Sequence, residues 1–291
     1  MRGGNRMTPG DVLIILAMLL YTMLCLYPFY YVLIYSISDP NLAVRGVYLL
    51  PRGLSFANYR RLFEQNNILW SAFISVSRSS LGSVLTVFFT SLFAYILMQE
   101  KLRFRKFLYR SVIVTMYVSA GLIPWYLLMT ALGFKNNFLL YILPSAVNAF
   151  YLILIKTYME SIPPSLQESA LIDGAGAFKI FRSIVFPVSK PILATVLIFA
   201  AVDQWNTWID NFYLCASKNL QTLQLLLLSF LVEQASFVQS AMAKSTLTTS
   251  TVTPNSIRMA ITMIVTLPVL LVYPIFQRYF VRGIMLGAIK G

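Results

Sequence analysis

Residues 12–35 read VLIILAMLLYTMLCLYPFYYVLIY, a run that contains no charged side chain. A helix of about 20 apolar residues crosses the hydrocarbon core of a bilayer. The run therefore predicts a membrane-spanning helix. It is too long for the apolar region of a cleaved signal peptide, and no small-residue cleavage site follows it, so we expect it to be retained.

The same criterion predicts five further spans, at residues 71–98, 108–132, 138–158, 189–209 and 258–280. Composition supports a membrane protein, because only 11% of the residues are charged and 58% are hydrophobic, whereas soluble domains carry about 25% charged residues. We expect an all-α fold: a polytopic membrane bundle of six transmembrane helices, forming a single transmembrane domain over residues 1–291.

The orientation of this bundle is predicted from the basic residues. The short loop 99–107 carries four cations against one acid: Lys101, Arg103, Arg105 and Lys106. Basic loops stay in the cytoplasm, which predicts that both termini are cytoplasmic. This topology accounts for the net charge of +13, so we expect no nucleic-acid partner.

The sequence lacks the residues that several kinds of chemistry require. The chain has no histidine, and its two cysteines, Cys25 and Cys215, lie far apart. No GxxxxGK[ST] phosphate-binding loop occurs. We expect no metal site, no cofactor bound by this chain and no catalytic residues.

Residues 160–187, called here the interspan segment, join the fourth and fifth predicted spans and include PPSLQESALIDGAGAFKIFRSIVFP at 163–187. We predict a first helix after the prolines, a turn at Gly174 and Gly176, and a second helix ended by Pro187. One face of the first helix is apolar at Leu166, Ala170 and Leu171. Such short helices are unstable alone, so they must dock, either on another polypeptide or on the chain's own bundle.

This segment resembles the EAA motif of binding-protein-dependent ABC importer permeases, through Glu168-Ser-Ala-x-x-Asp173-Gly174-Ala and Ile184-x-Phe186-Pro187. Ser169 stands where alanine is usual, and Phe186 where leucine is usual. The chain is most similar to the smaller, six-span permease of the maltose-type carbohydrate class, in its oligosaccharide and polysaccharide branch. The resemblance to this family extends to both ends of the chain, at Leu26–Phe29, Tyr273–Pro274, 277–283 and the tail 287–291.

The resemblance implies a transport subunit without its own ATPase site, in the bacterial cytoplasmic (inner) membrane. It implies four kinds of neighbour: a second homologous permease, two copies of a cytoplasmic ABC ATPase that holds ATP–Mg, an extracytoplasmic solute-binding protein, and membrane lipid. The residues it assigns to ATPase coupling are Glu168, Ser169, Ala170, Asp173, Gly174, Phe178, Ile184 and Pro187. Ala170 and Phe178 would pack into a cleft of the ATPase.

A polar stripe in residues 71–98 marks a candidate substrate path: Ser71, Ser75, Arg78, Ser79, Gly82, Thr86 and Thr90 recur every three or four residues. The alternative is close helix packing through small residues. A charge inside a span is costly unless it faces water or a partner, so we expect Arg78 to face the path or to pair with Asp203.

Other candidate path residues combine aromatic rings with amides and acids, as sugar binding requires. They are Asn148, Tyr151, Asp203, Trp205, Asn206 and Trp208. For the last four an interfacial aromatic belt is the alternative, and for Asn148 and Tyr151 a polar contact between helices.

The sequence thus predicts import of an oligosaccharide by alternating access. The candidate substrates include fragments of an acidic polysaccharide such as alginate or pectin, because the outer loops are basic and Arg78 lies within a span. An ion-coupled secondary transporter is the alternative, but Asp203 would be its single candidate coupling acid. A membrane enzyme would need paired acids or His/Cys clusters, and a structural scaffold would explain neither the stripe nor the motif.

Overall fold

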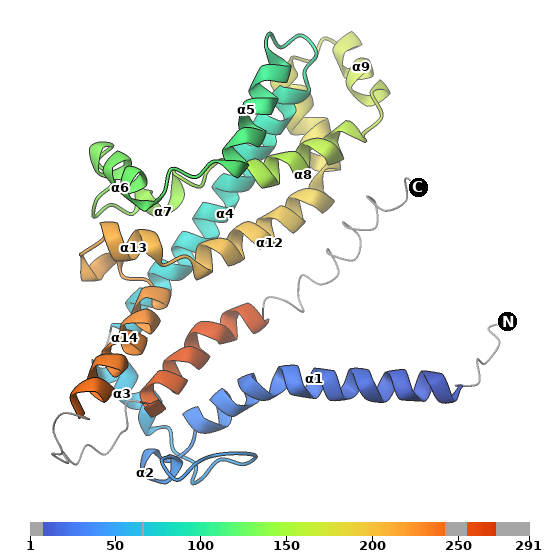
Figure 1. The fold of residues 1–291 in the computed structure, drawn as a ribbon. Coiled ribbons are helices and arrows are strands. Elements are labelled where there is room, and N and C mark those ends of the chain that lie inside the picture. Colours follow the sequence, from blue (N-terminus) through green and yellow to red (C-terminus); the bar gives the residue numbers. More distant parts are fainter. Residues whose placement is uncertain (1–7, 66, 242–254, 272–291) are drawn as a thin grey trace. The chain divides into compact units, whose positions relative to one another are not determined.

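The computed structural model describes residues 8–65, 67–241 and 255–271 and consists of helices joined by short connections (Figure 1). Two compact units emerge: residues 1–67 with 227–267, and residues 68–226 with 268–291. Each unit is described by itself.

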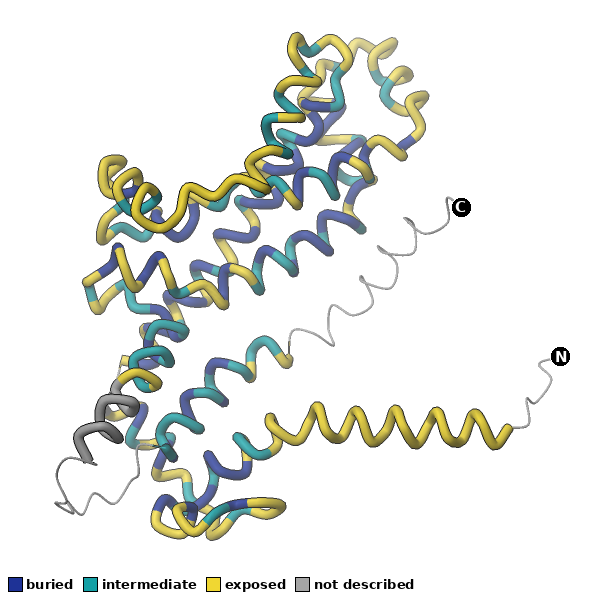
Figure 2. The backbone as a smooth tube through the Cα atoms, in the orientation of Figure 1, coloured by how far each residue is buried: buried dark blue, intermediate teal, exposed yellow. Residues whose placement is uncertain are grey.

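The first unit begins with α1 (Pro9–Ser36). Thr8 and Asp11 form a capping box: the Thr8 hydroxyl accepts from the Asp11 N–H at 3.3 Å, and the Asp11 carboxylate accepts from the Thr8 N–H at 2.8 Å. Most of α1 is exposed along its apolar length (Figure 2). The predicted first span is therefore a continuous helix long and apolar enough to cross a membrane.

Two short helices follow, α2 (Pro40–Ala43) and α3 (Ala57–Gln65). The core of this unit joins Ile34 and Tyr35 of α1 to Ala43, Val47 and Met259. Met259 belongs to a helix over Asn255–Leu271. The predicted sixth span, 258–280, is helical as far as Leu271, and residues 272–280 lie outside the described residues, as do 273–291 of the family resemblance.

The second unit is organised on α4 (Ile68–Met98), the predicted second span. This helix packs mainly against α12 (Lys190–Asn206) and next against α8 (Ala149–Glu160). Other helices of this unit are α5 (Arg105–Tyr117), α6 (Leu122–Ala131), α7 (Leu139–Ile142) and α13 (Ile209–Leu214). A 3-10 turn over Lys218–Leu220 precedes α14 (Leu223–Ala241), which continues into the first unit.

Two predicted spans are not continuous helices. The helix expected at 108–132 is divided into α5 and α6, because Val118 is extended and Gly121 has a φ of +82°. The helix expected at 138–158 is divided into α7 and α8 by 143–148, which include Pro144. Within the described residues, two helices pass the length and hydropathy test for a span, or three if a bent pair counts as one.

The interspan segment has the predicted helix–turn–helix form, with α9 (Ser165–Ile172) followed by α10 (Ala177–Ile180). We predicted that Pro187 ends the second helix, and this was wrong, because α11 runs through it. A π-helical turn over Phe181–Val185 leads into α11 (Phe186–Val188), and the direction changes by 81° at Ser189, before α12. Proline has no N–H to donate, and the Phe186 N–H bonds the carbonyl of Phe181, so the helix widens at this point rather than stopping.

Candidate functional site

The polar stripe of α4 faces the interior of the second unit, where its side chains bond neighbouring elements. Ser79 donates to the carbonyl of Ala201 at 2.6 Å, and Thr86 donates to the carbonyl of Ser145 at 2.8 Å. Ser75 accepts from the N–H of Leu223 at 2.8 Å. The stripe thus supports interhelical packing, which was the alternative to a substrate path, and part of it also lines a cavity.

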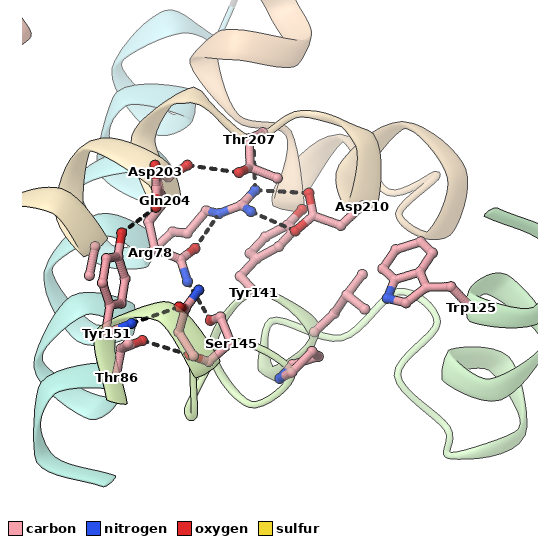
Figure 3. Close-up of a pocket in the computed structure, with 14 residues that line it drawn as sticks. Arg78, Thr86, Trp125, Tyr141, Ser145, Tyr151, Asp203, Gln204, Thr207 and Asp210 are labelled. Atoms are coloured by element: carbon pink, nitrogen blue, oxygen red, sulfur yellow. Dashed lines mark hydrogen bonds and ion pairs between the residues drawn. The ribbon is translucent and has the colours of Figure 1, made fainter. Parts of the chain in front are cut away.

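Arg78 is the centre of this polar interior (Figure 3). Its guanidinium makes two bonds to the Asp210 carboxylate, at 3.0 and 2.5 Å, and its side chain is only 3% exposed. It also donates to Gln204 Oε1 at 3.0 Å and to the carbonyl of Thr207 at 3.1 Å, and lies 4.6 Å from the centre of the Tyr141 ring. The bidentate pair matches the fork of the guanidinium to the carboxylate.

The partner predicted for Arg78 was wrong. Asp203 does not bond Arg78; its carboxylate accepts from the Tyr151 hydroxyl instead. The reason is local: α12 ends at Asn206, and the chain then turns into α13, which brings Asp210 rather than Asp203 to the guanidinium.

Gln204 connects the Arg78–Asp210 ion pair to the segment 143–148, between α7 and α8. Its amide nitrogen donates to the Ser145 hydroxyl at 2.5 Å while its oxygen accepts from Arg78. Gly82 makes room for this side chain, because a Cβ at residue 82 would lie 2.9 Å from the Gln204 amide. The glycine in the stripe is therefore needed for close approach.

These residues surround a cavity of about 210 Å³. Five residues of the predicted path line it: Arg78 and Thr86 of the stripe, with Asn148, Tyr151 and Asp203. Asn148 also caps α8, where its side chain accepts from the Tyr151 N–H at 3.1 Å. The cavity wall offers hydroxyls, an amide and aromatic rings together.

Three predicted path residues lie elsewhere. Trp205 is buried and lines a separate, mainly apolar cavity beside Ser79 and Ser83. Asn206 is exposed and accepts from Gln224 at 3.0 Å. Trp208 packs edge-to-face on Phe212. The cavity does not bring these three together with the five predicted residues that line it.

Sequence reasoning missed several residues of the cavity wall: Trp125, Tyr141, Ser145, Gln204, Thr207 and Asp210. A signal existed for two of them. Gln204 and Thr207 lie in the same polar stretch as Asp203 and follow it at one and four residues. Asp210 follows the end of the predicted fifth span, 189–209, and Tyr141 and Ser145 stand in apolar or turn-like surroundings that carry no polar pattern.

The turn of the interspan segment depends on Gly174. Its φ is +77°, a value that favours glycine, and its N–H bonds the carbonyl of Leu171 at 3.0 Å. The next N–H, of Ala175, bonds the carbonyl of Ala170 at 2.9 Å. The two bonds form a Schellman motif, which ends α9 with glycine at the position after the cap.

The two limbs of this segment, α9 and the helical stretch from α10 to α11, are buried differently. Ile180, Phe181 and Val185 belong to the core of the second unit, and the Phe181 ring lies 5.3 Å from that of Tyr95. Burying the Phe181 side chain stabilises this attachment by about 1.5–3 kcal/mol. The alternative of docking on the chain's own bundle therefore holds for the second limb, and Ala170, Ile184 and Phe186 also pack partly against that core.

The first limb leaves apolar side chains uncovered. Leu171 and Ile172 are 57 and 87% exposed, and Leu166 is also exposed. Phe178, which is 58% exposed, lies across the turn at the start of the second limb. Glu168, Ser169 and Asp173 lie on the surface beside them. Within this chain the first limb thus presents an apolar surface on a rigidly attached base.

The described residues contain no cluster of three or more metal-binding side chains. Cys215 is buried and Cys25 is exposed on α1. Burial raises the pKa of the Cys215 thiol.

These features define a class: a helical membrane protein with a polar cavity beside its longest buried helix and an apolar helix–turn–helix projecting from the bundle. The family model for "Binding-protein-dependent transport system inner membrane component" matches residues 87–286. The chain belongs to this family, and it is a permease subunit of an ABC importer.

Two relatives from Bacillus subtilis (strain 168) match nearly the whole chain. The "Polygalacturonan/rhamnogalacturonan transport system permease protein YtcP" is 36% identical, over 97% of this chain and 98% of that protein. "Protein LplC" is 33% identical, over 91% of this chain and 89% of that protein. A permease named for melibiose, raffinose and stachyose import, MelC of the same organism, is 27% identical over 88% of this chain and 90% of that protein.

A solved structure also matches. Its subject is "a bacterial ABC transporter involved in the import of the acidic polysaccharide alginate", and the matching chain is 29% identical with a TM-score of 0.83. The match covers 94% of this chain and 99% of that one. The ABC permease prediction is thereby confirmed over the ion-coupled alternative.

Proposed function

We propose that this permease moves an oligosaccharide by alternating access, driven by ATP hydrolysis in a separate subunit that docks on α9. In this proposal the chain is one six-span domain with both termini in the cytoplasm. Its assembly contains a second homologous permease, two ATPase copies holding ATP–Mg and an extracytoplasmic solute-binding protein. The chain itself binds no nucleotide and catalyses no reaction.

The observation that carries the coupling role is the unequal burial of the interspan segment. Phe181 anchors the second limb in the bundle, while Leu171 and Ile172 of the first limb are exposed. An apolar helical face outside the bundle is a surface for another polypeptide. Because the base is packed on α4 and α8 residues, a displacement of α9 would be passed to the helices around the cavity.

The cavity supports a sugar substrate. Its wall combines the Tyr151 and Thr86 hydroxyls, the Asn148 and Gln204 amides and aromatic rings, the groups that hydrogen-bond and stack on sugars. Its volume, about 210 Å³, is below the roughly 300–1,000 Å³ of sites that enclose a drug-sized ligand. It therefore has room for only part of an oligosaccharide.

A fragment of an acidic polysaccharide is the second candidate substrate. The names of the polygalacturonan and alginate systems favour it. The charges in this cavity favour a neutral sugar ring, since Asp210 neutralises Arg78 and leaves the Asp203 carboxylate on the wall. A uronate would therefore take its cationic contacts from elsewhere in the assembly.

The test uses the whole transporter in vesicles with its binding protein. Gly174→Pro should abolish uptake while ATP hydrolysis continues, because proline cannot adopt the φ of +77° at residue 174. Glu168→Lys should have the same effect by reversing a charge on α9. The matched control is Gly176→Ala, at a residue of ordinary φ with nothing within 4 Å of an added Cβ.

Full uptake by Gly174→Pro and Glu168→Lys would refute the coupling role. Uptake lost by Gly176→Ala as well would show that any substitution in the segment is disruptive. Uptake of neutral and uronic oligosaccharides by the unmodified transporter distinguishes the two substrate candidates.

A further inference from the structure

Residues 44–56 of the first unit, called here the apolar loop, connect α2 to α3. Tyr48, Leu49, Leu50 and Leu54 expose 67, 70, 75 and 75% of their surfaces. Apolar side chains gathered on one exposed segment indicate a contact with a protein or a membrane.

The base of this loop is firmly held. The Asp39 N–H donates to the carbonyls of Arg52 and Gly53, and the Ser55 N–H donates to the carbonyl of Ile37 at 2.9 Å. Val47 is buried against Ile34 and Tyr35 in the core of the unit. The exposed side chains therefore project from a fixed base.

Two tyrosines of α1 set the position of the tip along that helix. The hydroxyl of Tyr27 donates to the carbonyl of Tyr48 at 3.4 Å, and the hydroxyl of Tyr30 donates to the carbonyl of Leu49. The loop thus runs back beside the carboxyl-terminal part of α1, as Figure 1 shows. It does not extend away from the helix end.

The depth of these contacts follows from helix geometry. At 1.5 Å per residue, Tyr30 and Tyr27 lie about 9 and 14 Å before the end of α1 at Ser36. With α1 centred in a hydrocarbon core about 30 Å thick, they lie about 4 and 8 Å inside its boundary. The tip of the loop is attached to the part of α1 that is immersed in lipid.

The hydroxyl bonds also lower the cost of placing a loop at this depth. A carbonyl without a hydrogen bond is costly in hydrocarbon, and irregular backbone is tolerated where protein groups satisfy it. Tyr27 and Tyr30, three residues apart on one helix face, supply donors to two consecutive carbonyls of the tip. Arg45 and Arg52 stand on either side of the tip and are exposed, where long cationic side chains reach headgroup phosphates.

We propose that Tyr48, Leu49, Leu50 and Leu54 insert into the bilayer leaflet at the carboxyl end of α1, with Arg45 and Arg52 at its phosphates. The occupant of this surface is lipid, because its backbone is bonded at hydrocarbon depth. A solute-binding protein docks from the water and would meet the residues beyond the end of α1. The leaflet is the outer one in the topology proposed above.

The test is spin-label accessibility in the assembled transporter, reconstituted in vesicles of phosphatidylethanolamine and phosphatidylglycerol. Leu49→Cys and Leu50→Cys are labelled separately in a Cys25→Ala, Cys215→Ala background. Cys25, exposed on α1 two residues before Tyr27, is labelled with Cys215→Ala alone and reports the lipid depth of α1. Glu64→Cys on α3 is the water-facing control, since its side chain is 60% exposed.

We expect the ratio of oxygen to nickel-chelate collisions at residues 49 and 50 to exceed that at residue 64 several-fold and to approach that at Cys25, which lies deeper on α1. Nickel-chelate collisions as frequent at residues 49 and 50 as at 64 would overturn the proposal. So would few collisions with either reagent, which indicates cover by a protein. ATP-driven uptake by each labelled variant verifies assembly, and a water-accessible Cys25 would refute the immersion of α1 and the proposal with it.

Discussion

Removing one member of the Arg78–Asp210 pair should destabilise the protein far more than removing both. The two side chains are 3% and 11% exposed, and breaking a buried ion pair by removing one partner costs about 3–5 kcal/mol. The cost of Arg78→Met should lie at the upper end of this range, because Asp210 would keep only its hydrogen bond from the Asn211 N–H, at 2.7 Å. Asp210→Leu should cost less, since Gln204 and Thr207 still accept from the guanidinium.

The double variant removes both charges at once. Replacing a buried ion pair by apolar residues of similar volume is often neutral or stabilising, so Arg78→Met with Asp210→Leu should be more stable than either single variant. The assay is unfolding by sodium dodecyl sulfate in mixed micelles, followed for the four members of the double-mutant cycle. If the double variant loses as much free energy of unfolding as the two single variants together, the pair is not coupled and this reasoning fails.

Three further predictions concern the cavity wall. Gly82→Ala should cost about 1–3 kcal/mol, because its Cβ would displace Gln204, whereas Gly176→Ala should leave the unfolding free energy unchanged; equal losses would contradict the tight contact. Tyr151→Phe should lower uptake with a loss of only about 0.5–1.5 kcal/mol in stability, since it removes the hydroxyl bonded to Asp203; unchanged initial uptake rates would argue against a substrate role. Asp203→Asn should raise uptake of uronic relative to neutral oligosaccharides in a competition assay, and an unchanged ratio would show that this carboxylate does not select.

Long apolar runs were sufficient to predict some helices but not others. The runs at 12–35 and 71–98 became α1 and α4, which remain helical through Pro28 and Gly82 respectively. The segments 108–132 and 138–158 are also long and mainly apolar, but Gly121 and Pro144 interrupt the backbone. Mean hydropathy does not register a break of a few residues.

The candidate site was likewise predictable from the sequence only in part. The period of the α4 stripe placed Arg78 on the polar face of its helix, and the side chain is buried in the structure. Its partner could not be predicted, because both Asp203 and Asp210 were available and the choice depends on the turn after Asn206. The spacing of Gly174 predicted the turn of the interspan segment, whereas the course of the helix past Pro187 depends on the π-helical bonding of Phe181 with Phe186.

The central claim is that α9 meets the ATPase subunit, and a photoreactive side chain at Ile172 tests it most directly. Ile172 is 87% exposed at the end of α9, and Ile180, which is buried in the bundle, is the control. On irradiation of the assembled transporter, residue 172 should cross-link to the ATPase and residue 180 only within the permease. Cross-links from residue 172 that reach only lipid or the permease itself would contradict the account.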